Sequence, residues 1–125
     1  MDHRNNSPDK SQWTIDLIVE RSCFKLSLIS SWNEPQYTSW GLHFENDTVT
    51  YLGHSSQNEP NACKLFIAKF VDSNKNNKWH GYPANPSGQK PQDIPPESVL
   101  NQWLNKEYLR PQTIRKISRG QKCKL

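Results

Sequence analysis

Apolar and polar residues alternate along five short segments of the chain, which cover residues 13–19, 24–30, 39–44, 48–52 and 64–71. Successive side chains of a strand point to opposite faces of a sheet, so each segment predicts a strand with one buried face. The connections between the segments are short, which favours antiparallel pairing. The sequence therefore predicts a five-stranded antiparallel β-sheet over residues 13–71. Its expected inward-facing residues are Ile15, Leu17, Leu26, Leu28, Trp40, Leu42, Phe44 and Ile67.

The residues between these segments favour turns. We expect residues 20–22 to form a hairpin connection and residues 45–47 to form a turn, because Asn and Asp tolerate a left-handed backbone. The run 64–71 is the most apolar of the five segments. Strands that are covered on both faces are rich in apolar residues, so we place this run at the centre of the sheet.

The C-terminal third of the chain has a different pattern. Residues 72–96 hold five of the nine prolines and predict an irregular loop. A helix is expected from Pro95–Pro96 to Leu109–Arg110, and a second, shorter helix over Thr113–Arg119. Residues spaced three or four apart form the buried stripe of each helix: Val99, Leu100, Trp103, Leu104 and Tyr108 in the first, and Ile114 and Ile117 in the second.

The predicted fold class is therefore α+β, a single domain over residues 12–125 that follows a disordered N-terminal arm over residues 1–11. Hydrophobic residues make up 33% of the 125 residues, and five residues are tryptophan. This composition excludes a membrane protein, a coiled coil, a collagen and a repeat array. Three cysteines without a paired spacing, and no signal peptide, predict a cytoplasmic protein that lacks a disulfide scaffold.

Positive charge is concentrated at the C-terminal end. Residues 106–125 contain seven Lys and Arg against Glu107 alone, whereas residues 1–105 have a net charge of −2. Such asymmetry predicts an anionic partner, and Lys and Arg donors suit phosphate oxygens. The first hypothesis is thus that the basic helical pair binds the phosphate backbone of RNA or DNA. The expected contact residues are Arg110, Arg115, Lys116, Arg119 and Lys122, with Arg115, Arg119 and Lys122 as the main ones. The alternative is a solvated basic surface.

A second candidate site is the segment Lys78–Pro83, with the sequence KWHGYP. Trp79 and Tyr82 could stack on nucleic-acid bases while Lys78 reaches a phosphate. In the alternative interpretation, the two rings pack against the end of the sheet and have a structural role only.

Two further functions remain open. The first is a protein-interaction module, such as an antitoxin, an inhibitor or a subunit of a complex, that uses exposed aromatic residues: Trp32, Tyr37, Trp79 and Tyr82. The second is a metal-free nuclease in which His80 acts as general acid and base. The chain carries no catalytic signature and no phosphate-binding glycine loop, so we expect no cofactor and no metal site.

Overall fold

The computed structural model describes residues 3–4, 10–56, 63–88 and 90–125. These residues form two antiparallel sheets and three α-helices, which confirms the α+β class. A four-stranded sheet has the order β3-β2-β6-β7, with β2 at Thr38–Glu45, β3 at Thr48–Thr50, β6 at Ile67–Val71 and β7 at His80–Ala84. A three-stranded sheet has the order β1-β4-β5, with β1 at Gln12–Trp13, β4 at Gly53–His54 and β5 at Lys64–Leu65.

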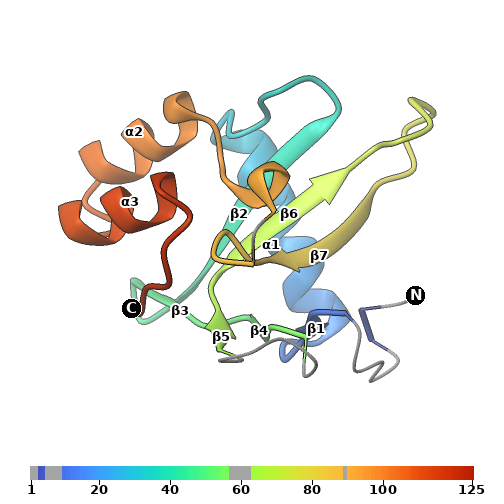
Figure 1. The fold of residues 1–125 in the computed structure, drawn as a ribbon. Helices are drawn as coiled ribbons and strands as arrows, with labels where there is room; N and C mark the ends of the chain where they lie inside the picture. Colours follow the sequence, from blue (N-terminus) through green and yellow to red (C-terminus); the bar gives the residue numbers. More distant parts are fainter. Residues whose placement is uncertain (1–2, 5–9, 57–62, 89) are drawn as a thin grey trace.

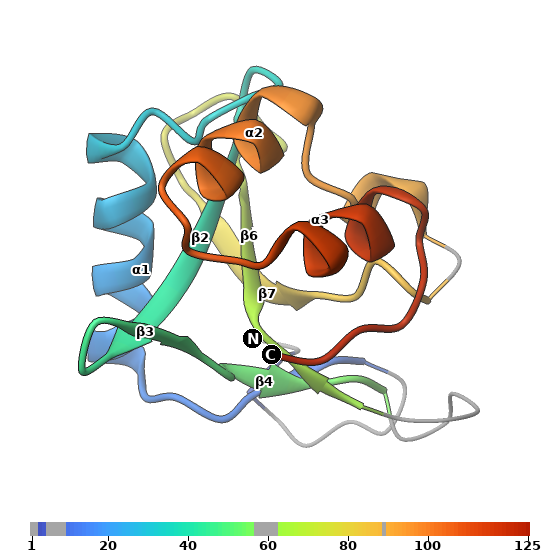
Figure 2. The same cartoon turned by 90° about the vertical axis from the view of Figure 1, so that its left-hand side faces the viewer.

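Helices cover both faces of the four-stranded sheet. Helix α1 (Leu17–Ile29) lies on one face, and α2 (Glu97–Asn105) and α3 (Pro111–Ser118) lie on the other (Figures 1 and 2). A short 3₁₀-helix, η1 (Pro91–Asp93), precedes α2. Each face of the sheet therefore has its own apolar cluster. The cluster under α1 holds Trp13, Cys23, Leu52, Ala68 and Phe70. The larger cluster under α2 and α3 includes Trp32, Trp40, Leu42, Ile67, Trp103 and Ile117.

The prediction of two strands over residues 13–19 and 24–30, joined by a hairpin at 20–22, is wrong. Apart from β1, this part of the chain forms helix α1, whose N-cap is Asp16: its carboxylate accepts a hydrogen bond from the Val19 N–H at 2.9 Å. Contrary to expectation, Leu17 and Leu28 are exposed. The buried residues of α1 are Glu20, Cys23 and Ser27, which share one face of a helix.

Small residues explain why α1 packs closely on β2. The hydroxyl groups of Ser27 and Ser39 are 2.6 Å apart, and both residues are fully buried. A Cβ atom at Gly41 would lie only 3.1 Å from the Cys23 carbonyl oxygen. The close approach of α1 to β2 thus depends on small side chains, whereas Phe24 of α1 packs on Phe70 of β6, with ring centroids 5.0 Å apart. A pattern based on large apolar residues does not detect such a face.

The central part of the predicted sheet is confirmed. Strands β2 and β3 pair around a turn at Asn46 and Asp47, both of which have positive φ angles. Strand β6 lies between β2 and β7, as expected for the most apolar segment. Of the expected inward-facing residues, Trp40, Leu42 and Ile67 are buried, whereas Ile15, Leu26 and Phe44 are half-buried.

Strand β7 corrects the prediction of an irregular loop over residues 72–96. It pairs antiparallel with β6, with Ala68 opposite Pro83 and Phe70 opposite Gly81. Proline cannot donate a hydrogen bond to a neighbouring strand and is therefore tolerated mainly in edge strands. Strand β7 is the edge strand of its sheet, so Pro83 fits there.

The C-terminal helical pair is confirmed, although α2 ends at Asn105 rather than near Leu109–Arg110. The chain turns at Glu107, which has a φ angle of +59°. The predicted disordered arm over residues 1–11 falls largely outside the described residues. Within the described part, Arg4 forms an ion pair with Glu20.

Candidate functional site

A basic cavity of about 320 Å³ lies beside α3. Its basic residues come from three places: Arg110 just before α3, Lys116 within it, and Lys122 and Lys124 in the segment that follows. Gln112, Thr113 and Cys123 complete the described lining, which contains no acidic residue. The structure thus brings together three of the five basic residues predicted from the sequence and adds Lys124.

The turn at the end of α3 explains how Lys122 and Lys124 come to line the same cavity as Lys116. Gly120 has a φ angle of +66°, its N–H donates to the Ile117 carbonyl at 3.0 Å, and the Gln121 N–H donates to the Lys116 carbonyl at 2.8 Å. These two bonds form a Schellman motif, which reverses the chain at the end of a helix. The following residues therefore run back beside α3, and the Leu125 N–H donates to the Tyr51 hydroxyl at 3.0 Å.

The electrostatics of this cavity favour an anion. Arg110, Lys116 and Lys124 are exposed, and none of them takes part in an ion pair within the described part of the chain. Burial raises the pKa of the Cys123 thiol, and the nearby Lys116 ammonium partly opposes that rise. A neutral thiol adds no negative charge to the lining, so the cavity stays positive.

Arg115 and Arg119, which the sequence analysis placed among the main contact residues, are exposed but are not part of the described lining of this cavity. Both lie on or just past α3. Their side chains add to the positive field of the same helix without contributing to the walls of the cavity. The sequence alone could not separate these arginines from the cavity residues, because the path of the chain after Gly120 decides the lining.

The two aromatic residues of the predicted stacking segment lie on different faces of the sheet. Trp79 packs beside Phe24 of α1, with ring centroids 5.2 Å apart. The hydroxyl group of Tyr82 donates to Asp93 Oδ1 at 2.9 Å on the other face. Burial raises the pKa of Tyr82, and the Asp93 charge and hydrogen bond raise it further. The structure therefore does not present these two rings side by side, and Lys78 is exposed at the start of the segment.

A second, larger cavity of about 730 Å³ lies on the α1 side and includes Trp79 and His80. Four aromatic side chains line it: Trp13, Phe24, Phe70 and Trp79. Its polar residues include Arg4, Glu20, Arg21 and His80. Sequence reasoning missed most of this site, because it interpreted residues 13–19 and 24–30 as strands joined by a hairpin at 20–22, whereas residues 17–29 form a helix.

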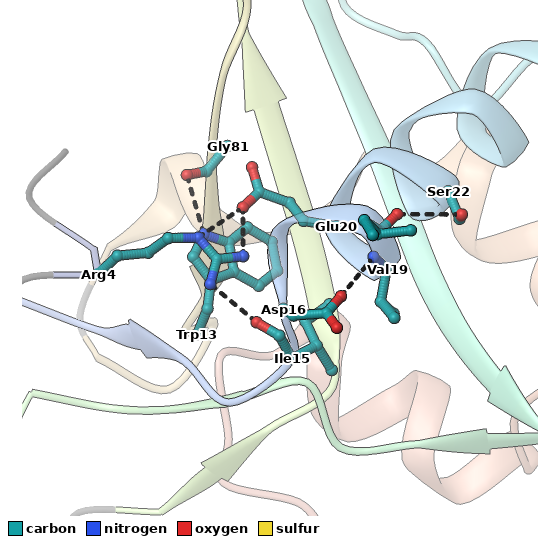
Figure 3. A network of polar contacts seen from close by, with 9 residues as sticks. Arg4, Trp13, Ile15, Asp16, Val19, Glu20, Ser22 and Gly81 are labelled. Atoms are coloured by element: carbon teal, nitrogen blue, oxygen red, sulfur yellow. Dashed lines mark hydrogen bonds and ion pairs between the residues drawn. The ribbon is translucent and has the colours of Figure 1, made fainter.

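An ion pair joins the N-terminal segment to α1 at this cavity (Figure 3). Arg4 donates to Glu20 Oε1 from Nη2 at 2.7 Å and from Nε at 3.1 Å, and its Nη1 donates to the Ile15 carbonyl at 2.9 Å. The guanidinium group lies 5.8 Å from the Trp13 ring centroid. The Trp13 indole N–H donates to the Gly81 carbonyl at 3.3 Å. These contacts connect β1, α1 and β7.

Two of the alternative hypotheses depend on His80 and Trp32, whose surroundings in the structure differ from those expected. The cavity that contains His80 has no residue from 110–119 in its described lining, so His80 and the C-terminal arginines do not share it. Trp32 is only 2% exposed and packs edge-on against Trp103, so it adds nothing to an exposed aromatic patch.

Comparison of the chain with protein-family models, with curated proteins and with solved structures found no match. No helix in the described part of the chain has both the length and the apolar character needed to cross a membrane. Within those same residues, no group of three or more His, Cys, Asp or Glu side chains is arranged to hold a metal ion.

Proposed function

We propose that this protein binds the phosphate backbone of RNA or DNA through the basic cavity beside α3. The observation that carries the proposal is the convergence of Arg110, Lys116, Lys122 and Lys124 on one cavity whose described lining has no acidic residue. Each phosphate that such groups neutralise releases condensed counterions, which drives binding without regard to sequence. The same proposal includes a cytoplasmic location, which the three free cysteines support.

The geometry favours this function over the two alternatives. A nuclease site would place His80 beside the cations that stabilise the phosphate charge, and the basic cavity does not include His80. An interaction surface built from exposed aromatic residues would use Trp32, Tyr37, Trp79 and Tyr82. Trp32 is buried and the other three are half-buried. Backbone binding needs only accessible positive groups at suitable spacing, and these are present.

The salt dependence of binding tests the proposal. Binding of fluorescently labelled single-stranded RNA and double-stranded DNA is measured by anisotropy at several salt concentrations. The triple variant Arg110→Gln, Lys116→Gln, Lys124→Gln removes three positive groups of the cavity. Each lost phosphate contact lowers the slope of log affinity against log salt by roughly 0.7–0.9, so we expect a decrease of about 2–3.

A matched triple variant controls for net charge. Lys106→Gln, Arg115→Gln, Arg119→Gln also removes three exposed charges from the helical pair, but none of them lines the cavity. We expect this variant to lower the slope by less than half as much. Equal effects of the two triple variants would show that the cavity has no special role. Absence of binding even at low salt would refute the function itself.

A further inference from the structure

The aromatic cavity on the α1 side has the features of a ligand site that is separate from the basic cavity. Its volume of about 730 Å³ lies within the range of roughly 300–1,000 Å³ that is typical of small-molecule pockets. It lies on the opposite face of the four-stranded sheet from α3, so it does not depend on the backbone-binding proposal. Two of its walls are the indole rings of Trp13 and Trp79.

Trp79 is held in place from one side. Its ring lies against Phe24, and its indole N–H donates to Asn77 Oδ1 at 3.3 Å. The residue is only half-buried, although it lines the cavity together with three other aromatic side chains. A ring that is fixed at one face and accessible beside a cavity is suited to stack on a planar ligand.

Glu20 provides a buried acceptor at the same cavity. The residue is 9% exposed, and its Oε1 atom accepts both hydrogen bonds from Arg4. Both hydrogen bonds that the described residues donate to the Glu20 carboxylate go to Oε1, whereas Oε2 lies next to Gly81, where a Cβ atom would be 3.0 Å away. Figure 3 shows the carboxylate between Arg4 and the Gly81 backbone. A planar N–H donor on a ligand could therefore donate to this oxygen atom.

The charge at the cavity selects an anionic ligand. Arg4 neutralises Glu20, and the remaining charged residue of the described lining, Arg21, is exposed and has no ion pair within the described residues. His80 is also exposed at the cavity and adds a ring that donates or accepts a hydrogen bond. Aromatic walls, a buried acceptor and an exposed cation together match a ring that carries a negatively charged group.

We propose that this cavity binds a nucleotide, with the base stacked on Trp79, a base N–H directed to Glu20, and the phosphate near Arg21. The nucleotide could be a free nucleoside monophosphate or the 5′-terminal nucleotide of a single strand, since both present the same chemistry. The interaction with Arg21 distinguishes this site from a general apolar pocket, because a neutral nucleoside lacks the group that Arg21 contacts.

The indole N–H resonances of the five tryptophans give a site-specific measurement. AMP, GMP, CMP, UMP, adenosine and a 5′-phosphorylated oligonucleotide are titrated separately while ¹H–¹⁵N spectra are recorded. Binding in the cavity shifts the Trp13 and Trp79 resonances and leaves those of Trp32, Trp40 and Trp103, which lie under the other face, unchanged. Shifts with mononucleotides indicate a free nucleotide, and shifts with the oligonucleotide alone indicate a strand end.

Three variants complete the test. Trp79→Ala should weaken binding roughly 5- to 150-fold, because base–aromatic stacking contributes about 1–3 kcal/mol. Trp79→Phe, which keeps a ring, should retain most of the affinity even where the alanine variant folds poorly. Arg21→Gln should weaken binding of the mononucleotide roughly two- to fivefold and leave adenosine unaffected, since exposed ion pairs contribute little. Arg115→Gln on α3 is the charge-matched control. It should change neither the affinity for the mononucleotide nor the affinity for adenosine.

Two results would overturn the proposal. The first is that no mononucleotide or oligonucleotide shifts the Trp13 and Trp79 resonances at millimolar concentration. The second is that adenosine binds as tightly as AMP and Arg21→Gln has no effect, which would leave an apolar pocket without the proposed phosphate contact. Because the measurement reports on the α1 side, either result is distinguishable from a failure of backbone binding at α3.

Discussion

A buried ion pair between β6 and η1 provides a direct test of the fold. Asp93 is 2% exposed and accepts hydrogen bonds from the Tyr82 hydroxyl and the Asn85 N–H, each at 2.9 Å. Its Oδ1 atom lies 3.9 Å from Lys69 Nζ. Lys69 is also buried and donates to the Gln92 carbonyl. Asp93→Asn would keep the shape of this side chain and remove its charge.

The expected cost follows from the surroundings of Lys69. Removing one partner of a buried ion pair costs about 3–5 kcal/mol, because the remaining charge is left uncompensated. Lys69 would keep the Gln92 carbonyl and would still lie 5.2 Å from the Trp40 ring centroid and 5.8 Å from that of Tyr82. These contacts partly compensate its charge, so we expect a loss of about 3 kcal/mol, near the lower end of the range.

Urea unfolding monitored by tryptophan fluorescence measures this loss. With a typical denaturant dependence of about 1–3 kcal/mol per molar urea, the midpoint should fall by roughly 1–3 M. Lys69→Met combined with Asp93→Asn should recover part of the stability, with a coupling free energy of at least about 1 kcal/mol. A loss below about 1 kcal/mol for Asp93→Asn, or additive effects of the two substitutions, would refute the reasoning.

The pH dependence gives a second measurement of the same pair. Burial lowers the pKa of Lys69, and the Asp93 charge partly opposes that decrease. The unfolded chain therefore binds more protons at this residue than the folded chain, and its contribution to stability increases as the pH rises toward the usual lysine pKa. Asp93→Asn removes the opposing charge, so this increase should begin at lower pH in the variant. Identical pH profiles between pH 7 and 9.5 would contradict the assignment.

Two further predictions concern the two apolar clusters. Trp103 is fully buried and packs edge-on against Trp32, with ring centroids 5.6 Å apart. Trp103→Ala should therefore lower the free energy of unfolding in urea by about 3–5 kcal/mol. A decrease below roughly 1 kcal/mol would show that Trp103 does not anchor α2. Burial, with a smaller effect of the Glu20 charge, raises the pKa of the Cys23 thiol to about 12. Iodoacetamide at pH 8 should therefore spare Cys23. It should modify Cys63 faster than Cys123, because burial also raises the pKa of the Cys123 thiol, although less than that of Cys23. Peptide mass spectrometry measures the labelling, and equal labelling of all three cysteines would contradict this.

The parts of the fold that were predicted correctly are those in which large apolar residues define the buried face. Val99, Leu100 and Trp103 mark the face of α2 because they are both apolar and buried. Trp40 and Leu42 alternate with Ser39 and Gly41 along β2, so the period of two is visible in the sequence. In these segments, hydrophobicity and burial coincide.

Helix α1 was missed because hydrophobicity and burial do not coincide there. Its buried face consists of Glu20, Cys23 and Ser27, whereas Ile18 is 76% exposed and Ile29 is 70% exposed. The apolar residues of this segment also happen to alternate, which imitates a strand. Only the partner strand, with Ser39 and Gly41 on the facing side, makes a face of small residues favourable.

The sequence locates the basic cavity better than the aromatic cavity. The basic cavity draws on residues within 110–124, so counting charges identified the region, and only the turn at Gly120 was needed to select its members. The aromatic cavity combines Arg4, Trp13, α1, Phe70 and Trp79, which are far apart in the sequence. No local pattern connects such residues, because the pairing of β7 with β6 and the packing of α1 on the sheet bring them together. A site assembled in this way depends on the whole fold. Substitutions that loosen α1 should therefore disturb the aromatic cavity. The basic cavity, which is built from α3 and the residues on either side of it, should still bind phosphate.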